Sequence, residues 1–294
     1  MRVVYHIENR GSSFIYHWFM YMIAGFRHIK NGNPTSGGDG GGVFEKNRHL
    51  YNSDMNKPPY YVCIQNFSNI DYQIQTMDLI KDEFVLISMD EIQEDDIVIN
   101  NYGENLHTMD GDYIHNQWVT NIESDYSEKI SCYRFIKSFE DKINITDEDM
   151  IKYKGKKFFL SRNKSHLLDG NSNLKRRHIL NEDDLVDILS EYNIERIYLE
   201  DYDLIEKIKL FKLSDLIISP NSAGLLFSLY SSSSTKIVEL NVPNPHQMSQ
   251  QYFDICKNLS IPYLKINCEK VDSHDNMLLD VNNLIDELKN NNII

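Results

Sequence analysis

The sequence contains little cysteine, and its few cysteines lie far apart. Four occur among the 294 residues, with no CxxC pair and no histidine at metal-ligand spacing; they are Cys63, Cys132, Cys256 and Cys268. Structural zinc sites need closely paired cysteines, and disulfide frameworks need more cysteine in a shorter secreted chain. We therefore expect reduced, mostly structural thiols and no bound metal.

The sequence also lacks a long apolar run. Its most apolar stretch, FIYHWFMYMIAGF at 14–26, has only about 13 residues, whereas a membrane-spanning helix needs about 20. The N-terminal stretch MRVVYHIENRGSSF is too short and too polar for a signal peptide. These features predict a cytoplasmic protein without a membrane span.

Basic residues are clearly outnumbered. Lysine and arginine together number 30 against 44 aspartates and glutamates, so the formal net charge is -14. Binding to nucleic acid requires clustered positive potential, and this balance argues against such a partner. Any site for phosphate must be a local exception on an acidic surface.

What remains is an ordinary globular composition, with 41% hydrophobic and 25% charged residues. A chain of this length can form two domains, each with its own core. The oligomeric state does not follow from these features.

The C-terminal half alternates short apolar runs with helical patterns. The expected strands are 156–161, 194–200, 215–220, 235–240 and 262–267, and the expected helices are 181–192, 203–214, 223–232 and 249–260. Strands that alternate with helices are typical of βα units, which form a parallel sheet covered on both faces. We therefore predict a Rossmann-like domain in this half.

The N-terminal half shows a similar but less regular alternation. Its expected strands are 2–7, 60–65, 84–89 and 96–102, and its expected helices are 14–29, 73–83 and 127–143. The polar stretch 144–155 is the predicted linker, and 275–290 has apolar residues at the spacing of an amphipathic helix. The predicted domains are 1–150 on the acceptor side, 151–275 for a nucleotide, and a terminal helix at 276–294. Two facing α/β domains would form a ligand-binding cleft between them.

A turn of small residues, Asn221-Ser222-Ala223-Gly224, separates two apolar runs. Such a turn brings backbone N–H groups close to a ligand at a helix N-terminus, where the helix dipole favours phosphate. The alternative is a tight strand-to-helix turn without a ligand.

Three arginines lie near the start of the Rossmann-like half. Arg162 follows the first expected strand of that half, and Arg176 and Arg177 precede the next helix. The arginine fork suits phosphate oxygens, so this grouping in an acidic chain favours pyrophosphate recognition. The alternative is that these arginines balance the acidic residues that follow. Asn181 is the expected N-cap of that helix, with Asp184 as a weak capping-box partner.

These motifs, in their order and spacing, resemble glycosyltransferase family 61 from Phe158 to Tyr263. The matching pieces are Ser161-Arg162, Arg176-Arg177, Asn181-Glu182, the run SPNSAGLLFSLY, and the strand KIVEL that contains Glu239. A second matching feature is the pair His17-Trp18 in the first expected helix.

The resemblance implies the fold, the reaction and the donor-binding residues. The family contains inverting enzymes, among them plant xylosyltransferases, protein O-linked N-acetylglucosaminyltransferases and bacterial polysaccharide-biosynthesis proteins. It implies two facing Rossmann-like domains of the GT-B type, with the active site in the cleft. It also implies a nucleotide-diphosphate sugar, most simply a UDP-sugar, as donor, a glycan or glycosylated polypeptide as acceptor, and no cofactor or metal. The donor-binding residues are then Arg162, Arg176, Arg177, Asn221, Ser222, Ala223, Gly224 and Glu239.

An inverting transfer needs a general base for the acceptor hydroxyl. His17 is the first candidate, because the resemblance places it on the acceptor side of the cleft. The alternative for His17 is a helix histidine packed beside Trp18, and Glu8, at the end of the first strand, is the substitute base.

The sequence departs from the family pattern at several positions. Asn221 and Ser222 replace a histidine and a glycine, Lys207 replaces the glutamine after Glu206, and Tyr21 replaces an acidic residue. These departures raise the alternative of a catalytically inactive protein that binds sugar nucleotides or acts in assembly.

A third reading is a metal-dependent glycosyltransferase of the DxD class. Two matches to DxD occur, at Asp110 with Asp112 and at Asp201 with Asp203. Chance matches are expected in so acidic a chain. The glycine-rich stretch SGGDGGG at 36–42 has no strand before it and is interpreted as a loop, not as a phosphate loop.

Overall fold

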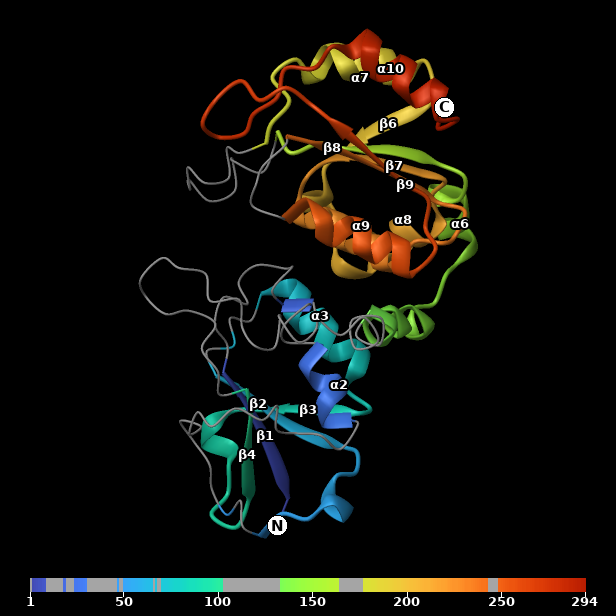
Figure 1. The fold of residues 1–294 in the computed structure, drawn as a ribbon. Coiled ribbons are helices and arrows are strands. Elements are labelled where there is room, and N and C mark those ends of the chain that lie inside the picture. The colour runs from blue at the N-terminus through green and yellow to red at the C-terminus, as the bar shows by residue number, and fades with distance from the viewer. Residues whose placement is uncertain are drawn as a thin grey trace. The chain divides into compact units, whose positions relative to one another are not determined.

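The computed structural model describes residues 2–8, 18–19, 24–30, 47, 50–65, 67, 70–102, 133–163, 177–242 and 248–294. The chain divides into two compact units, Met1–Ile143 and Asn144–Ile294. Each unit contains its own parallel sheet, so the predicted α/β class with parallel, Rossmann-like sheets is confirmed (Figure 1). Within the described part of the chain, no helix is both long and apolar enough to cross a membrane.

The first unit is built on a parallel sheet with strand order β3-β2-β1-β4. Its strands are β1 (Val3–Glu8), β2 (Tyr60–Gln65), β3 (Phe84–Ile87) and β4 (Ile97–Tyr102). Its described helices include α2 (Ala24–Lys30), α3 (Asp71–Ile80) and the 3-10 segments η3 (Ser53–Met55), η4 (Met89–Glu91) and η5 (Ser138–Lys142). The strand sequences are mostly apolar because strands of a parallel sheet are buried on both faces. Helix α3 packs against β3, and α2 packs against β4.

The second unit is built on a parallel sheet with strand order β6-β5-β7-β8-β9. Its strands are β5 (Lys157–Leu160), β6 (Ile194–Ile197), β7 (Leu216–Pro220), β8 (Lys236–Asn241) and β9 (Tyr263–Asn267). Its helices are α6 (Asp147–Tyr153), α7 (Glu182–Ser190), η8 (Leu199–Asp201), α8 (Leu204–Leu213), η9 (Ala223–Tyr230), α9 (Met248–Asn258) and α10 (Val281–Asn290).

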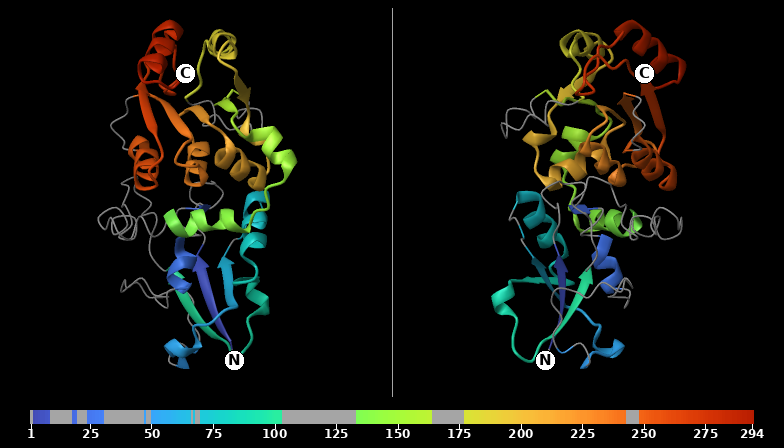
Figure 2. Two further views of the ribbon diagram at one scale, coloured as in Figure 1. Left: turned by 90° about the vertical axis from the view of Figure 1, so that its right-hand side faces the viewer. Right: turned by 60° about the vertical axis from the view of Figure 1, so that its left-hand side comes forward.

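Helices cover both faces of this second sheet. Helices α7 and α10 lie on one face, and α8 and α9 lie on the other (Figures 1 and 2). The chain moves from β5 outward to β6 and then back past β5 to β7, and right-handed crossovers place the helices of the two directions on opposite faces. The reversal makes the gap between β5 and β7 the topological switch point, outside which α/β proteins bind ligands.

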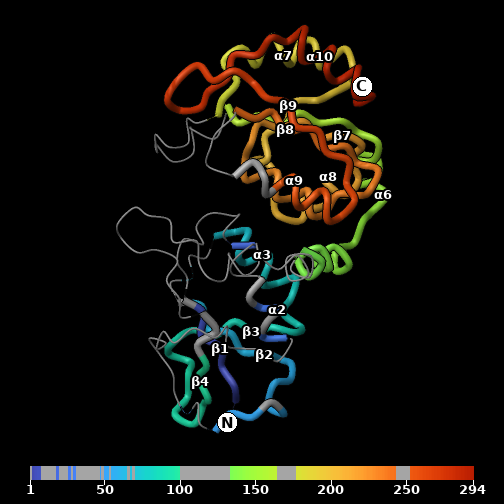
Figure 3. Tube along the Cα trace, viewed as in Figure 1, coloured from blue at the N-terminus to red at the C-terminus, as the bar shows by residue number. Residues whose placement is uncertain are grey.

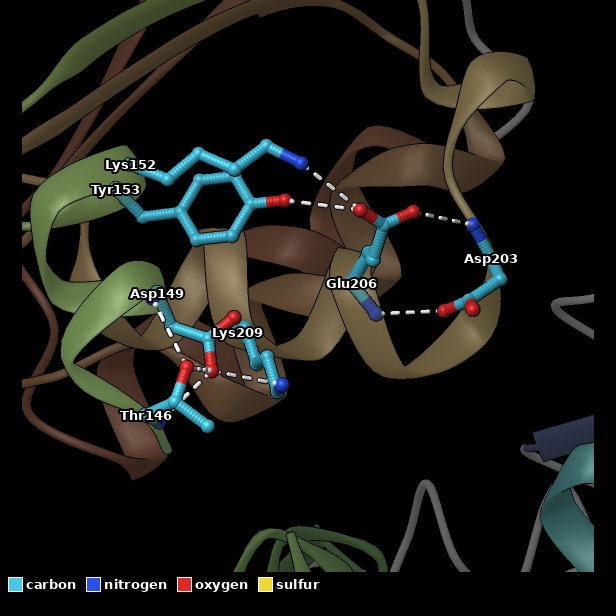
Figure 4. A network of polar contacts seen from close by, with 7 residues as sticks. All are labelled: Thr146, Asp149, Lys152, Tyr153, Asp203, Glu206 and Lys209. Atoms are coloured by element: carbon cyan, nitrogen blue, oxygen red, sulfur yellow. Dashed lines mark hydrogen bonds and ion pairs between the residues drawn. The ribbon is translucent and has the colours of Figure 1, made fainter. Parts of the chain in front are cut away.

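The predicted linker is wrong for most of its length, because the polar stretch 144–155 contains α6. Asp149 and Thr146 form a capping box, in which the Thr146 hydroxyl accepts from the Asp149 N–H. Ion pairs then fasten α6 to α8, with Lys152 Nζ 2.9 Å from Glu206 and Lys209 Nζ 2.8 Å from Asp149 (Figure 4). The stretch has a polar sequence because its polar and charged residues form the capping box and the ion pairs of α6.

Two predicted α-helices also differ from the structure. Residues 223–230 form a 3-10 helix, in which Leu225 to Tyr230 are all buried. The terminal helix begins at Val281 and not at 275, because Asp280 caps it by accepting from the Asn283 N–H. Met277, which precedes this helix, is buried and pairs with Ile179 in a short bridge.

Candidate functional site

Two arginines converge on Asn221 at the switch point of the second sheet. Arg162 follows β5, and its Nη1 donates to the Asn221 carbonyl oxygen at 3.2 Å. Arg177 precedes α7, and its Nη1 donates to the same carbonyl at 3.3 Å and to Asn221 Oδ1 at 2.6 Å. The structure thus brings two guanidinium groups together at the carboxyl end of β7, where this fold class binds ligands.

A buried carboxylate holds the other side of the Asn221 amide. Asn221 Nδ2 donates to Glu239 Oε1 at 2.6 Å, and the Tyr263 hydroxyl donates to Glu239 Oε2. The Glu239 side chain is fully buried, and burial raises the pKa of its carboxyl while Tyr263, Asn221 and nearby Arg177 act in the opposite direction. Both carboxylate oxygens therefore accept hydrogen bonds from protein groups, and Glu239 fixes the orientation of the Asn221 amide.

A second buried carboxylate supports the turn that carries Arg162. The Ser161 hydroxyl donates to Glu182 Oε1 at 2.6 Å and accepts from the Asn163 N–H at 3.1 Å. Glu182 is only 2% exposed, and burial raises the pKa of its carboxyl against the effects of Ser161 and Arg196. This chain of hydrogen bonds determines the path of the backbone on both sides of Arg162.

The backbone at Arg177 adopts a left-handed conformation, with φ of 62°. Residues other than glycine seldom adopt it, so surrounding contacts must hold it. The Arg177 N–H donates to the His274 carbonyl at 3.0 Å, and the His178 N–H donates to Asn276 Oδ1 at 2.8 Å. His274 and Asn276 lie in the segment between β9 and α10, and Figure 3 traces the chain along it.

The same segment explains the role of Asn181, whose predicted capping hydrogen bond is absent. Asn181 occupies the N-cap position of α7, but its side chain makes no capping bond to that helix. Instead its Nδ2 donates to the Leu279 carbonyl at 2.9 Å and its Oδ1 accepts from the Leu279 N–H at 3.0 Å. The predicted N-cap position is therefore confirmed, but the side chain bonds Leu279, which lies nearly a hundred residues away in sequence.

The small-residue turn is only partly available to a ligand. The Asn221 N–H donates to the Leu240 carbonyl at 2.9 Å and thereby extends the pairing of β7 with β8. Asn221 and Ser222 are buried, whereas Ala223 is exposed. The N–H groups at the start of η9 are the ones that a helix leaves without intrahelical acceptors.

Gly224 has a packing reason of its own. A β-carbon at this position would lie 2.5 Å from Leu199 Cδ1. The glycine therefore lets η9 approach η8 closely, which is the alternative explanation of the turn. Contact between Gly224 and a ligand stays a prediction.

His17, the first candidate base, and one arginine lie beyond what the structure describes. His17, Arg176, Asp110 and Asp112 are outside the described residues. Glu8 is the last residue of β1, and its backbone pairs with Gln65. No spatial relation among these side chains follows, and their roles stay predictions.

The sequence neighbour of His17 and one acid of the second DxD match are described. Trp18, next to His17, is fully buried, and its Nε1 donates to Thr76 Oγ1 at 3.1 Å. Asp203, the second acid of one DxD match, accepts the Glu206 N–H at 2.8 Å as the N-cap of α8. Trp18 thus packs in the core of the first unit, and the Asp203 carboxylate has a structural role. Among the described residues, no group of three or more metal-ligating side chains could hold a metal ion.

Sequence reasoning missed two tyrosines beside the arginines. Tyr263, in β9, contacts Glu239 because the register pairs it with Ile237, and residues two apart on a strand face the same side. Tyr252, in α9, is buried, and its pKa is raised by burial and by Glu239 and lowered by Arg177 and Arg162. No local pattern marks either tyrosine, because their neighbours depend on strand order and register.

The comparisons with known proteins agree with the resemblance seen in the sequence. The family model for glycosyltransferase 61 matches residues 15–238. A comparison with curated proteins found no match. The family match ends just before Glu239.

Proposed function

Because this chain belongs to glycosyltransferase family 61, we propose that it transfers a sugar from a nucleotide-diphosphate sugar, most simply a UDP-sugar, to a hydroxyl group. The acceptor is a glycan or a glycosylated polypeptide. The two units correspond to the two facing domains of the GT-B type, with the second unit binding the donor.

The convergence of Arg162 and Arg177 on Asn221 is the observation that supports this proposal most strongly. Both guanidinium groups meet at the switch point of the sheet, in a chain with a net charge of -14. Guanidinium groups bind phosphate oxygens through paired N–H donors. The donor diphosphate therefore binds at this end of β7, with the N–H groups at the start of η9 as further donors.

Inverting transfer is a single displacement. The acceptor oxygen attacks the anomeric carbon, the bond from that carbon to the diphosphate oxygen breaks, and the acceptor proton passes to a base. His17 is the proposed base, and Glu8 is the substitute. The arginines stabilise the negative charge that develops on the leaving diphosphate, which removes the need for a metal ion.

Replacing either arginine tests the donor site. Arg162→Ala or Arg177→Ala should weaken UDP binding by about 1.5–3 kcal/mol, the range for hydrogen bonds to charged groups. Isothermal titration in EDTA measures this, with Arg134→Ala, at an exposed position of the first unit, as the control. Unchanged affinity in both variants would remove these arginines from the site. UDP binding that appears only with added manganese would contradict metal independence.

A further inference from the structure

Several contacts that hold Arg177 come from residues beyond the family match. The match ends at residue 238. Glu239 lies just after it, Tyr263 lies in β9, and Asn276 lies in the segment between β9 and α10. This C-terminal part of the chain therefore contributes to a site whose arginines lie inside the match.

The guanidinium group of Arg177 is oriented through a relay of side chains. Asn221 offers Oδ1 to Arg177 at 2.6 Å because its Nδ2 is bound to Glu239, also at 2.6 Å. A buried carboxylate needs a donor for each oxygen, and Tyr263 is the second donor to Glu239. Loss of the Tyr263 hydroxyl would leave a buried carboxylate oxygen without this donor, which favours protonation of Glu239 and a looser Asn221.

The backbone of Arg177 is held from a different direction. Asn276 accepts the His178 N–H through Oδ1, and its Nδ2 donates to Asp272 Oδ2 at 2.8 Å. Asp272 also accepts the backbone N–H groups of His274 and Asn276. Hydrogen bonds within residues 272–276 thus stabilise this loop, and its contact with His178 holds the left-handed backbone at Arg177.

We propose that Tyr263 and Asn276 are positioning residues for Arg177. Tyr263 acts through Glu239 and Asn221 on the guanidinium group, and Asn276 acts on the backbone beside it. This inference rests on the proposed function, in which Arg177 contacts the donor diphosphate. Neither residue touches the donor itself, and together they keep the arginine oriented before the ligand arrives.

Tyr263→Phe removes only the hydroxyl and is the first test. UDP and inorganic pyrophosphate, which carries no base, are the probes in isothermal titration. We expect affinity for both to fall about three- to tenfold, the effect of one well-placed hydrogen bond. The matched control is Tyr153→Phe, which also removes a tyrosine hydroxyl that donates to a glutamate. The Tyr153 hydroxyl lies 3.4 Å from Glu206 Oε1, where α6 contacts α8 (Figure 4). The control should leave both affinities unchanged.

A double-mutant cycle separates positioning from general destabilisation. If Tyr263 acts through Arg177, Tyr263→Phe should cause no further loss of affinity in an Arg177→Ala background. The same coupling should appear for Asn276→Ala, which serves as the second variant if Tyr263→Phe fails to fold. Equal losses of affinity in both backgrounds would overturn the positioning role.

The remaining outcomes distinguish this inference from the proposed function. Arg177→Ala that leaves both affinities unchanged would overturn the donor role of Arg177. Wild-type protein that binds neither probe would overturn the diphosphate site and the positioning role with it. Arg177→Ala that weakens binding, while neither Tyr263→Phe nor Asn276→Ala does, would overturn the positioning role alone.

Discussion

At the scale of single residues, Gly224 shows how one position can carry two explanations. The sequence left two explanations of the turn open, close approach of the backbone to a ligand and a tight strand-to-helix turn without a ligand. The structure places Leu199 Cδ1 2.5 Å from a β-carbon at this position. A side chain at this position would force the end of the partly buried Leu199 side chain to move.

We expect Gly224→Val to lower the melting temperature modestly, because moving the end of the Leu199 side chain costs about 1 kcal/mol, the low end of the range for overpacking. Shortening the neighbour in a Gly224→Val, Leu199→Ala variant should recover part of the loss, since the obstructing methyl group is then gone. Leu199→Ala alone is the control. Thermal unfolding of the three variants measures the effect, and a Gly224→Val protein as stable as the wild type would refute it. UDP affinity on the same samples shows whether the turn also contacts the donor.

Two buried glutamates, Glu239 and Glu182, support the residues around the two arginines. A donor contact of Glu239 stays a prediction, and in the structure its two oxygens accept from Asn221 and Tyr263. Glu182 likewise binds Ser161 beside Arg162. Glu182 thus supports the turn that carries Arg162, and Glu239 holds Asn221, which accepts from Arg177, so the proposed donor contacts depend on both buried carboxylates.

At the scale of secondary-structure elements, the contact of α6 with α8 fastens the start of the second unit. Hydrogen bonds that Lys209 and the Thr146 backbone N–H donate to the carboxylate hold the pKa of Asp149 at about 2, below its ordinary value of 3.8. The folded state thus binds the proton less tightly than the unfolded chain does. This contribution to stability is present above pH 3.8 and is lost as the pH falls toward 2.

Asp149→Asn should therefore destabilise the protein at neutral pH and much less in acid. The expected difference at pH 7 is about 1 kcal/mol or less, the range for an ion pair near the surface. Urea unfolding of wild type and variant at a series of pH values measures it. Asp147→Asn, at an exposed position in the same turn, is the control. A difference that stays constant down to acid pH would show that Asp149 acts otherwise than through its charge.

At the scale of the whole molecule, the described residues of the proposed donor site all come from one unit. Arg162, Arg177, Asn221 and Glu239 lie in Asn144–Ile294, which has its own sheet and its own apolar core. That core includes residues of α10 and of β5, so the terminal helix is part of the fold of this unit. Donor binding and sugar transfer should therefore be separable.

The fragment 144–294 should fold alone and bind UDP with nearly the affinity of the whole chain, but it should not transfer sugar. Its sheet and core are complete, whereas the proposed bases, His17 and Glu8, lie in the other unit. Circular dichroism, titration with UDP and a transfer assay test the three parts of this expectation. A folded fragment without affinity for UDP would mean that the first unit contributes to donor binding.

The sequence by itself determined the order and type of most elements and the family. Buried parallel strands appear as short apolar runs, and helices appear through their spacing of apolar residues, so both are local signals. The turn at Asn221–Gly224 and the arginines near 162 and 177 could be located for the same reason. The family match to residues 15–238 confirms the resemblance that these motifs indicated.

Only the tertiary structure decided how these pieces meet. Arg162 and Arg177 reach Asn221 across 59 and 44 residues of chain, because strand order places β5 beside β7. The register of β9 on β8 brings Tyr263 to Glu239, and the segment before α10 returns to Arg177. A capping box and ion pairs stabilise α6 where the sequence suggested a linker, and the buried segment η9 is a 3-10 helix. Such contacts depend on the energy of the whole packed unit, which no local pattern of residues contains.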